Sequence, residues 1–232
     1  VGYVNWGYEA IGRFDSWEQI ANYPVDNDRK GNRTVVPGDI MYKDQNNDGV
    51  INYLDERPIG YRVDSTPTLN FGINLSASWK GFDLAMDWTG SRMTSWNQCY
   101  ETARPFQNDG NSPDEVLKDA WHLSDIWDAN SPLIPGKYPM VRLNTDETSA
   151  YDKSSYWLHN VTYLKLRNLE VGYTFPKTWL NRTGISNLRL FVSGTNLLTL
   201  SNLSVMDPEC ASDNGLDYPP MRVINIGVNL KF

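Results

Sequence analysis

A twelve-residue stretch places oxygen-bearing side chains at the spacing used by the calcium loops of EF-hands. It runs from Asp44 to Asp55 and reads DQNNDGVINYLD. Oxygen ligands stand at loop positions 1, 3, 5, 9 and 12, glycine stands at the sharp turn of position 6, and isoleucine stands at the apolar position 8. Position 7 would ligate by its backbone carbonyl and position 9 through water, so the predicted ligands are Asp44, Asn46, Asp48, Val50, Asn52 and Asp55.

Two features distinguish this stretch from an EF-hand. Its flanks, VVPGDIMYK and ERPIGYRVDSTP, have no helical pattern, and position 12 is aspartate, whose shorter arm weakens bidentate ligation. The alternative is a hydrated turn, because Asn, Asp and Gly form turns without an ion. We favour a structural calcium ion that cross-links a loop and takes no part in redox or hydrolytic chemistry.

Groups that could carry out catalysis are sparse. The carboxylates between residues 114 and 128 fit a charged helix face better than the paired acids of a glycosidase. His122 and His159 have no catalytic or metal-binding neighbour in the sequence. No nucleophile motif and no phosphate-binding loop occurs. We therefore expect no enzyme activity and no organic cofactor.

The composition narrows the class of protein. A net charge of -7 without a cluster of Lys or Arg disfavours a nucleic-acid partner. The 9 Trp and 13 Tyr fit a carbohydrate-binding surface or the aromatic girdles of a membrane β-barrel. No apolar run approaches the length of a transmembrane helix. Cys99 and Cys210 lack metal-site spacing and are either a disulfide pair or two free thiols.

Strict alternation of apolar and polar residues predicts β-strands. The first two strands form a hairpin around a tight turn at Lys80-Gly81, with one apolar and one polar face. The first is long enough to cross a bilayer when tilted. The apolar face switches near Asn168, which predicts a bulge or strand end there. The predicted strands cover residues 69–79, 82–90, 162–175, 188–198 and 222–232.

Short and long connections alternate between these strands. The long ones span residues 91–161 and 199–220, and residues 1–68 form a further loop region. Within the first, Ser112 as N-cap, Pro113 as first helical residue and Glu115 as capping-box partner predict a short helix. Membrane barrels have short periplasmic turns and long extracellular loops. If Lys80-Gly81 is periplasmic, the loops are extracellular and the C-terminus is periplasmic.

Several segments in order resemble the SusC/RagA-type TonB-linked outer-membrane transporters, over nearly the whole chain. The resemblance lies in PGDIMYKDQNNDGVINYLDERPIG, in the hairpin TPTLNFGINLSASWKGFDLAMDWTGS, in YLKLRNLEVGYTFP and LRLFVSGTNLLTLS, and in the last ten residues. It implies an all-β fold, namely about five C-terminal strands of a 22-stranded antiparallel transmembrane β-barrel with long extracellular loops that carry a short helix. Five strands cannot close a barrel. We therefore expect the other strands and the plug in the remainder of the polypeptide.

The resemblance also implies a function. Such a protein resides in the bacterial outer membrane, in contact with lipid, and works with a SusD/RagB-like surface lipoprotein. It draws energy from TonB, which would act on the missing N-terminal part. It imports oligosaccharides or, in some members, peptides. We expect a glycan importer, with a peptide importer of the RagA type as the alternative.

Two further predictions concern aromatic residues. The last residue, Phe232, ends an amphipathic strand and would serve as an assembly signal that is recognised by strand addition. Aromatic residues in loops either stack on sugar rings or fill a structural role, and the candidates for ligand contact are Trp96, Tyr100, Trp121, Trp127 and Trp157. A rival from another class is a secreted, calcium-stabilised β-sandwich that binds carbohydrate, with its apolar faces packed sheet on sheet.

Overall fold

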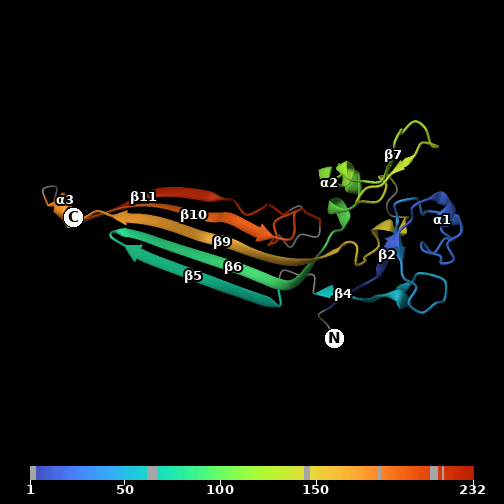
Figure 1. Cartoon of the computed structure of the whole chain (residues 1–232), viewed down its shortest axis with the longest axis horizontal. Helices are drawn as coiled ribbons and strands as arrows, with labels where there is room; N and C mark the ends of the chain where they lie inside the picture. Colours follow the sequence, from blue (N-terminus) through green and yellow to red (C-terminus); the bar gives the residue numbers. More distant parts are fainter. Residues whose placement is uncertain (1–3, 62–66, 144–146, 182–183, 210–213, 216) are drawn as a thin grey trace. The chain divides into compact units, whose positions relative to one another are not determined.

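The computed structural model describes residues 4–61, 67–143, 147–181, 184–209, 214–215 and 217–232. Strands dominate it, and the helices are short (Figure 1). The elements in chain order are β1 (Val4–Gly7), β2 (Ala10–Arg13), α1 (Trp17–Ala21), β3 (Ile40–Tyr42), η1 (Tyr53–Asp55), β4 (Arg57–Tyr61), β5 (Leu69–Trp79), β6 (Phe82–Asn97), η2 (Tyr100–Thr102), η3 (Gln107–Asp109), α2 (Asp114–Lys118), β7 (His122–Leu123), β8 (Leu133–Ile134), η4 (Ser149–Tyr151), β9 (Leu158–Thr174), α3 (Lys177–Leu180), β10 (Asn187–Ser201) and β11 (Val223–Lys231).

The chain divides into two compact units. The first comprises residues 1–65, 94–160 and 211–217, and the second comprises residues 66–93, 161–210 and 218–232. The boundaries at 93/94 and 160/161 fall within strands β6 and β9. No helix in the described ranges has the length and apolar character needed to cross a membrane.

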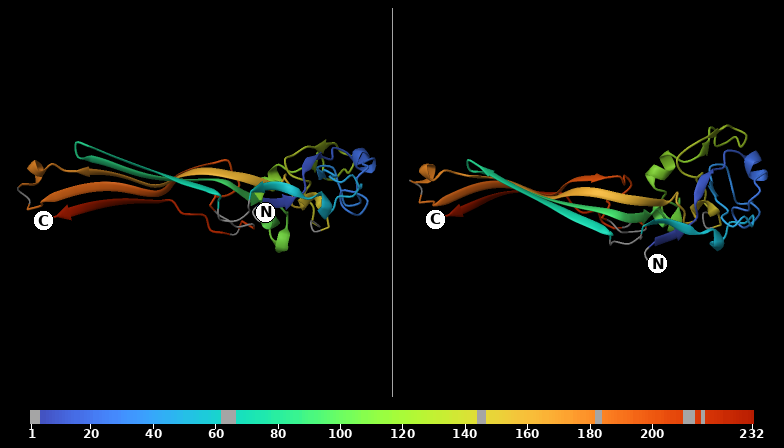
Figure 2. Two further views of the ribbon diagram at one scale, coloured as in Figure 1. Left: turned by 90° about the horizontal axis from the view of Figure 1, so that it is seen from below. Right: turned by 60° about the horizontal axis from the view of Figure 1, so that its bottom comes forward.

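The second unit is built on one twisted sheet with the strand order β11-β10-β9-β6-β5 (Figures 1 and 2). Strands β5 and β6 pair antiparallel around Lys80 and Gly81, whose positive φ angles of 48° and 91° allow a two-residue hairpin turn. The register places Ile73 opposite Trp88 on one face and Asn74 opposite Asp87 on the other. The predicted hairpin is confirmed.

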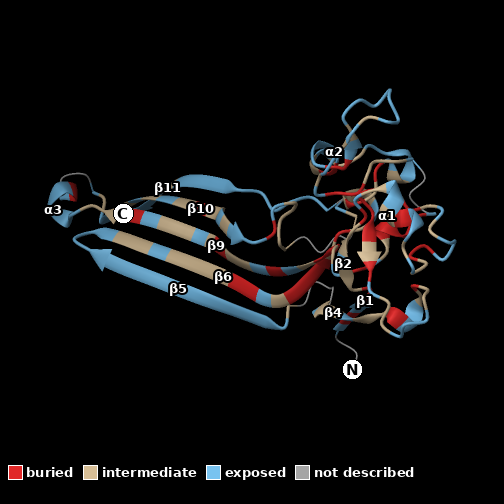
Figure 3. Cartoon of the chain, turned by 45° about the vertical axis from the view of Figure 1, so that its right-hand side comes forward, coloured by how far each residue is buried: buried red, intermediate tan, exposed pale blue. Residues whose placement is uncertain are grey.

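The apolar face of this sheet is open. Ile73, Leu75 and Ile226 are 44%, 49% and 83% exposed, and β5 and β11 are exposed along almost their whole length (Figure 3). In the described part of the chain no second sheet packs on them. This arrangement contradicts the β-sandwich, which would bury these side chains between two sheets.

The polar face carries an ion-pair network across three neighbouring strands. Arg189 of β10 donates to Asp83 of β6 and, at 2.6 Å, to Glu170 of β9. Its guanidinium crosses β9 over Gly172, where a Cβ atom would lie 2.4 Å from Nη2. Gly172 therefore provides the space that lets an arginine reach across the intervening strand.

The predicted change of face near Asn168 coincides with an irregularity. The β9–β10 register shifts between Thr195 and Leu198, next to the pair of Thr195 with Asn168. Asn196 lies in the bulge with a φ of 53°. The extra residue belongs to β10, so the bulge changes which side of the sheet the following residues of β10 face, and β9 has no inserted residue there.

Strands β6 and β9 extend beyond their predicted limits. β6 continues to Asn97 and β9 begins at Leu158. The polar side chains of Ser91, Thr94 and Ser95 are buried in this extension. Alternation of apolar and polar residues does not predict this part of the strands, because residues of both kinds are buried here.

The first unit has its own core of aromatic and aliphatic side chains. The larger cluster is centred on Tyr42, Tyr138 and Trp157, each at most 1% exposed, and a smaller one comprises Phe14, Ile20 and Val35. Full burial of such side chains contributes roughly 1.5–3 kcal/mol each. The region predicted as loop is therefore a folded body.

Polar side chains replace secondary structure in this body. The buried amide of Asn27 donates to Ile40 O and accepts from Tyr42 N, both at 3.0 Å, as a paired strand would. Arg13 donates to the carbonyls of Gly38, Gly136 and Lys137 and lies between the rings of Trp121 and Tyr156. Short, irregular segments are thus held by hydrogen bonds from side chains to the backbone.

The predicted helix is present as α2, but its cap differs from the prediction. The helix begins at Asp114 with Pro113 as N-cap, and no side chain caps it. The Ser112 hydroxyl is buried without a hydrogen-bond partner among the described residues. Because the first turn starts one residue later than predicted, Ser112 lies outside it.

The Asp28 carboxylate is 3% exposed and accepts four hydrogen bonds. Oδ1 accepts from the backbone N–H groups of Lys30 and Asn32 at 2.9 and 2.8 Å, and Oδ2 accepts from the N–H and hydroxyl of Thr34, both at 2.7 Å. Burial raises the pKa of Asp28, but the hydrogen bonds from Thr34 and Lys30 outweigh it and hold the pKa below its usual range.

We expect Asp28→Asn to lower the free energy of local unfolding of residues 26–34 by about 1–3 kcal/mol at pH 7, because N–H donors lose a charged acceptor. The folded pKa lies below the unfolded value of about 3.9. The stabilisation that the Asp28 carboxylate gives to the folded state is therefore fully present above about pH 4. It is lost as the pH falls through the pKa that Asp28 has in the folded state. Hydrogen exchange of the amides of Lys30, Asn32 and Thr34 measures it. A difference that is equal at pH 7 and pH 3 would contradict this explanation.

Candidate functional site

The Asp44 loop is closed by its own side chains. Asp44 accepts hydrogen bonds from the N–H groups of Asn47 and Gly49 at 2.7 and 2.8 Å, and Asp48 accepts from Val50 N at 2.9 Å. Gly49 has a φ of 83°, which the sharp turn at position 6 requires. The hydrogen bond from Val50 and then that from the Asn46 amide lower the pKa of Asp48.

Asp55 at position 12 joins the two ends of the loop. Its carboxylate is fully buried and accepts from Gln45 N and Asn52 N, both at 2.8 Å. Asn52 accepts in turn from Leu54 N and forms a capping box with Asp55 at the start of η1. A one-turn helix and a capping box hold the position that the second helix occupies in an EF-hand.

The other predicted ligands converge. The Asn46 amide lies 2.8 Å from Asp48 Oδ2, and the Asn52 amide lies 3.1 Å from the Val50 carbonyl oxygen and 3.4 Å from Asp48 Oδ2. Loop positions 3, 5, 7 and 9 thus meet at one point. Among the described residues, no group of three or more His, Cys, Asp or Glu side chains is arranged to hold a metal. An ion here would depend on amide and carbonyl oxygens as well as on carboxylates.

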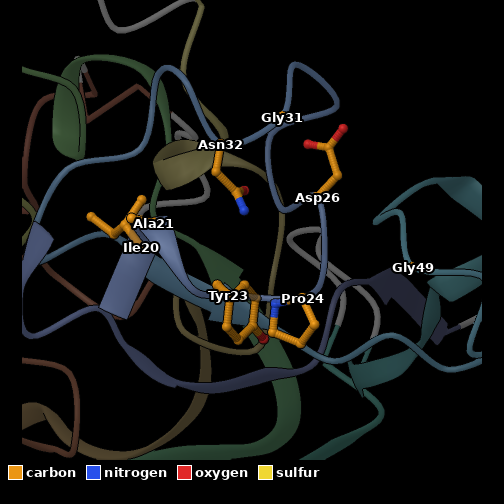
Figure 4. A pocket seen from close by; sticks show the side chains of 8 residues that line it. All are labelled: Ile20, Ala21, Tyr23, Pro24, Asp26, Gly31, Asn32 and Gly49. Carbon is orange, nitrogen blue, oxygen red and sulfur yellow. The ribbon is translucent and has the colours of Figure 1, made fainter. Parts of the chain in front are cut away.

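A second loop supports the first. Asp26 N donates to Gly49 O at 2.8 Å and Ile51 N donates to Asp26 O at 3.0 Å, in a parallel bridge between Asp26 and Val50. Between the two loops lies a pocket of about 310 Å³ (Figure 4). Tyr23, Asp26 and Asn32 line it, and Gly49 forms its edge on the Asp44 side. No pattern in the sequence predicts this pairing, because it depends on backbone groups.

The five aromatic candidates differ in exposure. Trp96, Trp121 and Trp157 are 5%, 6% and 1% exposed, and Trp96 stacks on His159. Tyr100 and Trp127 are 52% and 91% exposed. The buried indoles pack in the first unit, so Tyr100 and Trp127 are the candidates that present a ring to solvent.

Two candidates come together in one pocket. Tyr100 and Trp157 line a hollow of about 310 Å³ with Arg104, Lys153 and Cys99. Cys210 lies outside the described residues, as does any pairing with it. Phe232 follows β11 and is 83% exposed, which leaves its proposed role in assembly a prediction.

The chain is similar to TonB-dependent receptors along almost its whole length. It is 30% identical to TonB-dependent receptor P3 of Formosa agariphila and 27% identical to receptor P26 of the same organism, each over 97% of this chain and 22% of the relative. TonB-dependent receptor SusC of Bacteroides thetaiotaomicron is 31% identical over 34% of this chain. No family model matches the sequence.

Solved structures agree on the fold. The structure of the RagAB peptide transporter matches 99% of this chain and 22% of its own with a TM-score of 0.63 and 21% identity. The RagAB peptide importer in the open-open state matches with a TM-score of 0.61 and 22% identity, over 100% of this chain and 23% of its own. The chain spans about a fifth of the length of the curated relatives. On this evidence, the chain is homologous to TonB-dependent receptors over 97% of its length, and its antiparallel β-strand segment has the fold of the matching part of the RagAB structures.

Proposed function

We propose that this chain provides loops and barrel strands of an outer-membrane importer that is energised through TonB. The observation that carries the proposal is the similarity to TonB-dependent receptor P3 over 97% of the chain. An exposed apolar face and an ion-paired polar face on one sheet support it, because barrel strands face lipid on one side and an aqueous lumen on the other.

The lengths of the connections support the proposed orientation. The two-residue turn at Lys80-Gly81 and the C-terminus belong on the periplasmic side, and the folded body of the first unit belongs outside the cell. A SusD/RagB-like lipoprotein is the proposed partner at the loops. TonB would act on the part of the polypeptide that precedes this segment.

Oligosaccharide is the proposed substrate, and peptide is the alternative. The exposed rings of Tyr100 and Trp127 favour ligands that stack on aromatic groups. RagAB is described as a peptide transporter, but at 21% identity it supports the fold of this chain and not its substrate.

A pair of substitutions tests which face of the sheet contacts lipid. Leu84 lies on the apolar face opposite Ala77, and Asp87 lies on the polar face, 3.2 Å from the Asn168 amide. We expect Leu84→Asp to reduce the amount of folded protein in outer membranes, because a carboxylate facing lipid costs on the order of a kcal/mol or more. Asp87→Leu should be tolerated. Equal amounts of the two variants, measured by heat-modifiable gel migration, would exclude this facing.

Uptake by cells that express the complete receptor and its lipoprotein tests the substrate. We expect fluorescently labelled neutral oligosaccharides to enter only when TonB is functional. Labelled peptides from a protein digest serve as the matched competitor. Uptake of peptides with exclusion of the oligosaccharides would establish the alternative.

We also propose that the Asp44 loop binds a structural calcium ion. The convergence of Asn46, Asp48, Val50 O and Asn52 supports this proposal. Asp44 and Asp55 keep lone pairs after accepting their backbone N–H bonds. An ion would replace the contacts between the amides and Asp48, while the bonds that close the loop persist. Its role would be to stiffen the segment that leads into β5.

Calcium should slow hydrogen exchange of the amides of residues 44–55 in the complete receptor, relative to protein stripped with EDTA. Asp48→Ala should abolish this protection, because it removes the carboxylate at the point of convergence. Asp125→Ala, a change at an exposed acid that caps its own turn, is the matched control. Unchanged exchange with calcium, and an anomalous-scattering map without a peak at the loop, would sink the proposal.

A further inference from the structure

The apolar face of the sheet in the second unit ends in a row of charged residues. Strand β9 contributes Lys165 and Arg167, which alternate in step with Leu169 and lie on its side of the strand, because no residue is inserted in β9 between them. Tyr173 lies on this side as well, and its ring contacts that of Phe82 on β6 at 4.6 Å between centroids. The two cations therefore project from the same face as the apolar side chains.

Strand β6 adds a third cation to this row. Arg92 is paired with Leu69 in the β5–β6 register, so it also projects from the apolar face. It is exposed, and no described residue forms a hydrogen bond or an ion pair with its guanidinium. Cations on the lipid-facing side of a barrel are costly at the midplane of the membrane and cost much less near its surface. The charged row therefore belongs at a membrane surface.

The length of the strands fits this placement. Arg92 lies ten residues beyond Phe82 on β6, which is roughly 34 Å of strand. A tilt of about 35–45° reduces this length to roughly 24–28 Å across the membrane, and the apolar band of outer-membrane barrels is about 25 Å tall. With the Lys80-Gly81 turn on the periplasmic side, the charged row lies at the outer surface, level with the lipid headgroups.

A hollow of about 500 Å³ lies beside the row, within the size range of ligand pockets. Phe71 of β5 and Tyr163 and Arg167 of β9 stand around Gly90 of β6, which has no side chain, and Glu209 completes this side of the lining. The Phe71 ring leans over Gly90, where a Cβ atom would lie 2.2 Å from Cζ. We call this space the Gly90 hollow. Because it opens on the apolar face and has aromatic walls, a lipid acyl chain is the group that reaches it.

The charges around the hollow leave one cation without a counter-ion. Lys165 is 1% exposed and donates to Asp207 Oδ2 and Glu209 Oε2, both at 2.9 Å. Arg167 donates to both carboxylate oxygens of Glu209. Two cations and two carboxylates balance there, so Arg92 gives the row a net charge of about one positive unit at neutral pH. A lipid with an anionic headgroup supplies the missing charge, and an uncharged or zwitterionic one does not.

We propose that the Gly90 hollow and Arg92 bind an anionic, phosphate-bearing lipid of the outer leaflet. One acyl chain lies in the hollow against Phe71 and Tyr163, and a headgroup phosphate pairs with the Arg92 guanidinium. This inference rests on the proposed function as an outer-membrane importer, because it requires that the apolar face contacts lipid. The ligand belongs to the surrounding membrane and is not the transported substrate.

The test measures the Kd of the complete, detergent-solubilised receptor for lipid A and for its deacylated sugar phosphate by native mass spectrometry. We expect lipid A to bind at least tenfold more tightly than the deacylated compound or phosphatidylethanolamine. Arg92→Gln should raise the Kd for both phosphate compounds about fivefold, which corresponds to about 1 kcal/mol per cation near an anionic membrane surface. Phe71→Ala should raise the Kd for lipid A severalfold and leave that for the deacylated compound unchanged.

A matched control removes an exposed arginine elsewhere. Arg33→Gln makes the same change of charge in the first unit and should leave both Kd values unchanged. Arg92→Lys, which keeps the charge, should bind lipid A within twofold of wild type. Heat-modifiable gel migration confirms that each variant is folded.

The outcomes separate this site from the importer proposal. Equal Kd values of wild type and Arg92→Gln for lipid A, or an equal loss in Arg92→Gln and Arg33→Gln, overturn the lipid site and leave the importer proposal intact. Binding of the deacylated compound or of phosphatidylethanolamine as tight as that of lipid A also overturns the site, because the acyl chain or the anionic charge would then be dispensable. Absence of the wild-type receptor from outer-membrane fractions overturns both proposals.

Discussion

Backbone hydrogen bonds hold β5 and β6 in a register that places Ile73 opposite Trp88 and Asn74 opposite Asp87. Because side chains alternate along a strand, a slip by one residue would exchange the two faces and turn every carboxylate of β6 toward the apolar side. The same register sets Gly72 opposite Thr89. The separation of an apolar from a polar face, on which the membrane proposal depends, thus follows from one pairing pattern that begins at the Lys80-Gly81 turn.

The polar face reinforces this register through side chains of opposite charge. Arg189 links Asp83 and Glu170 on two other strands, so a shift of any one strand would leave a charged group unpaired. Asp83 and Glu170 keep more than a third of their side-chain surface exposed, so each pair contributes only modestly to stability. Gly172 belongs to this network although it forms no ion pair, because a side chain at that position would block the path of Arg189. Strand order and charge pattern therefore specify the same arrangement.

Periodicity predicted the second unit well and the first unit poorly, for a physical reason. Strands β5, β9 and β11 each have one apolar and one polar face. This difference between the faces is visible in the sequence as alternation of apolar and polar residues. In the first unit, β1 to β4 are short, and their neighbours are held by Asn27, Asp28 and Arg13, whose residue types are typical of turns and surfaces. The sequence placed the Asp44 loop correctly as a turn centred on Gly49. Nothing in the sequence showed that Asp26 would pair with it, or that Trp96, Trp121 and Trp157 would be buried.

The absence of flanking helices around the Asp44 loop is explained by how the loop is closed. In an EF-hand two helices hold the ends of the loop together. Here Asp55 joins the ends, by accepting N–H bonds from Gln45 and Asn52, and the bridge to Asp26 holds the middle. These bonds are made between the protein's own groups, so the loop need not order itself at the expense of binding energy. An ion bound to such a preformed loop would have little conformational change to drive, which is the property of a structural site and not of a sensor that opens a pair of helices.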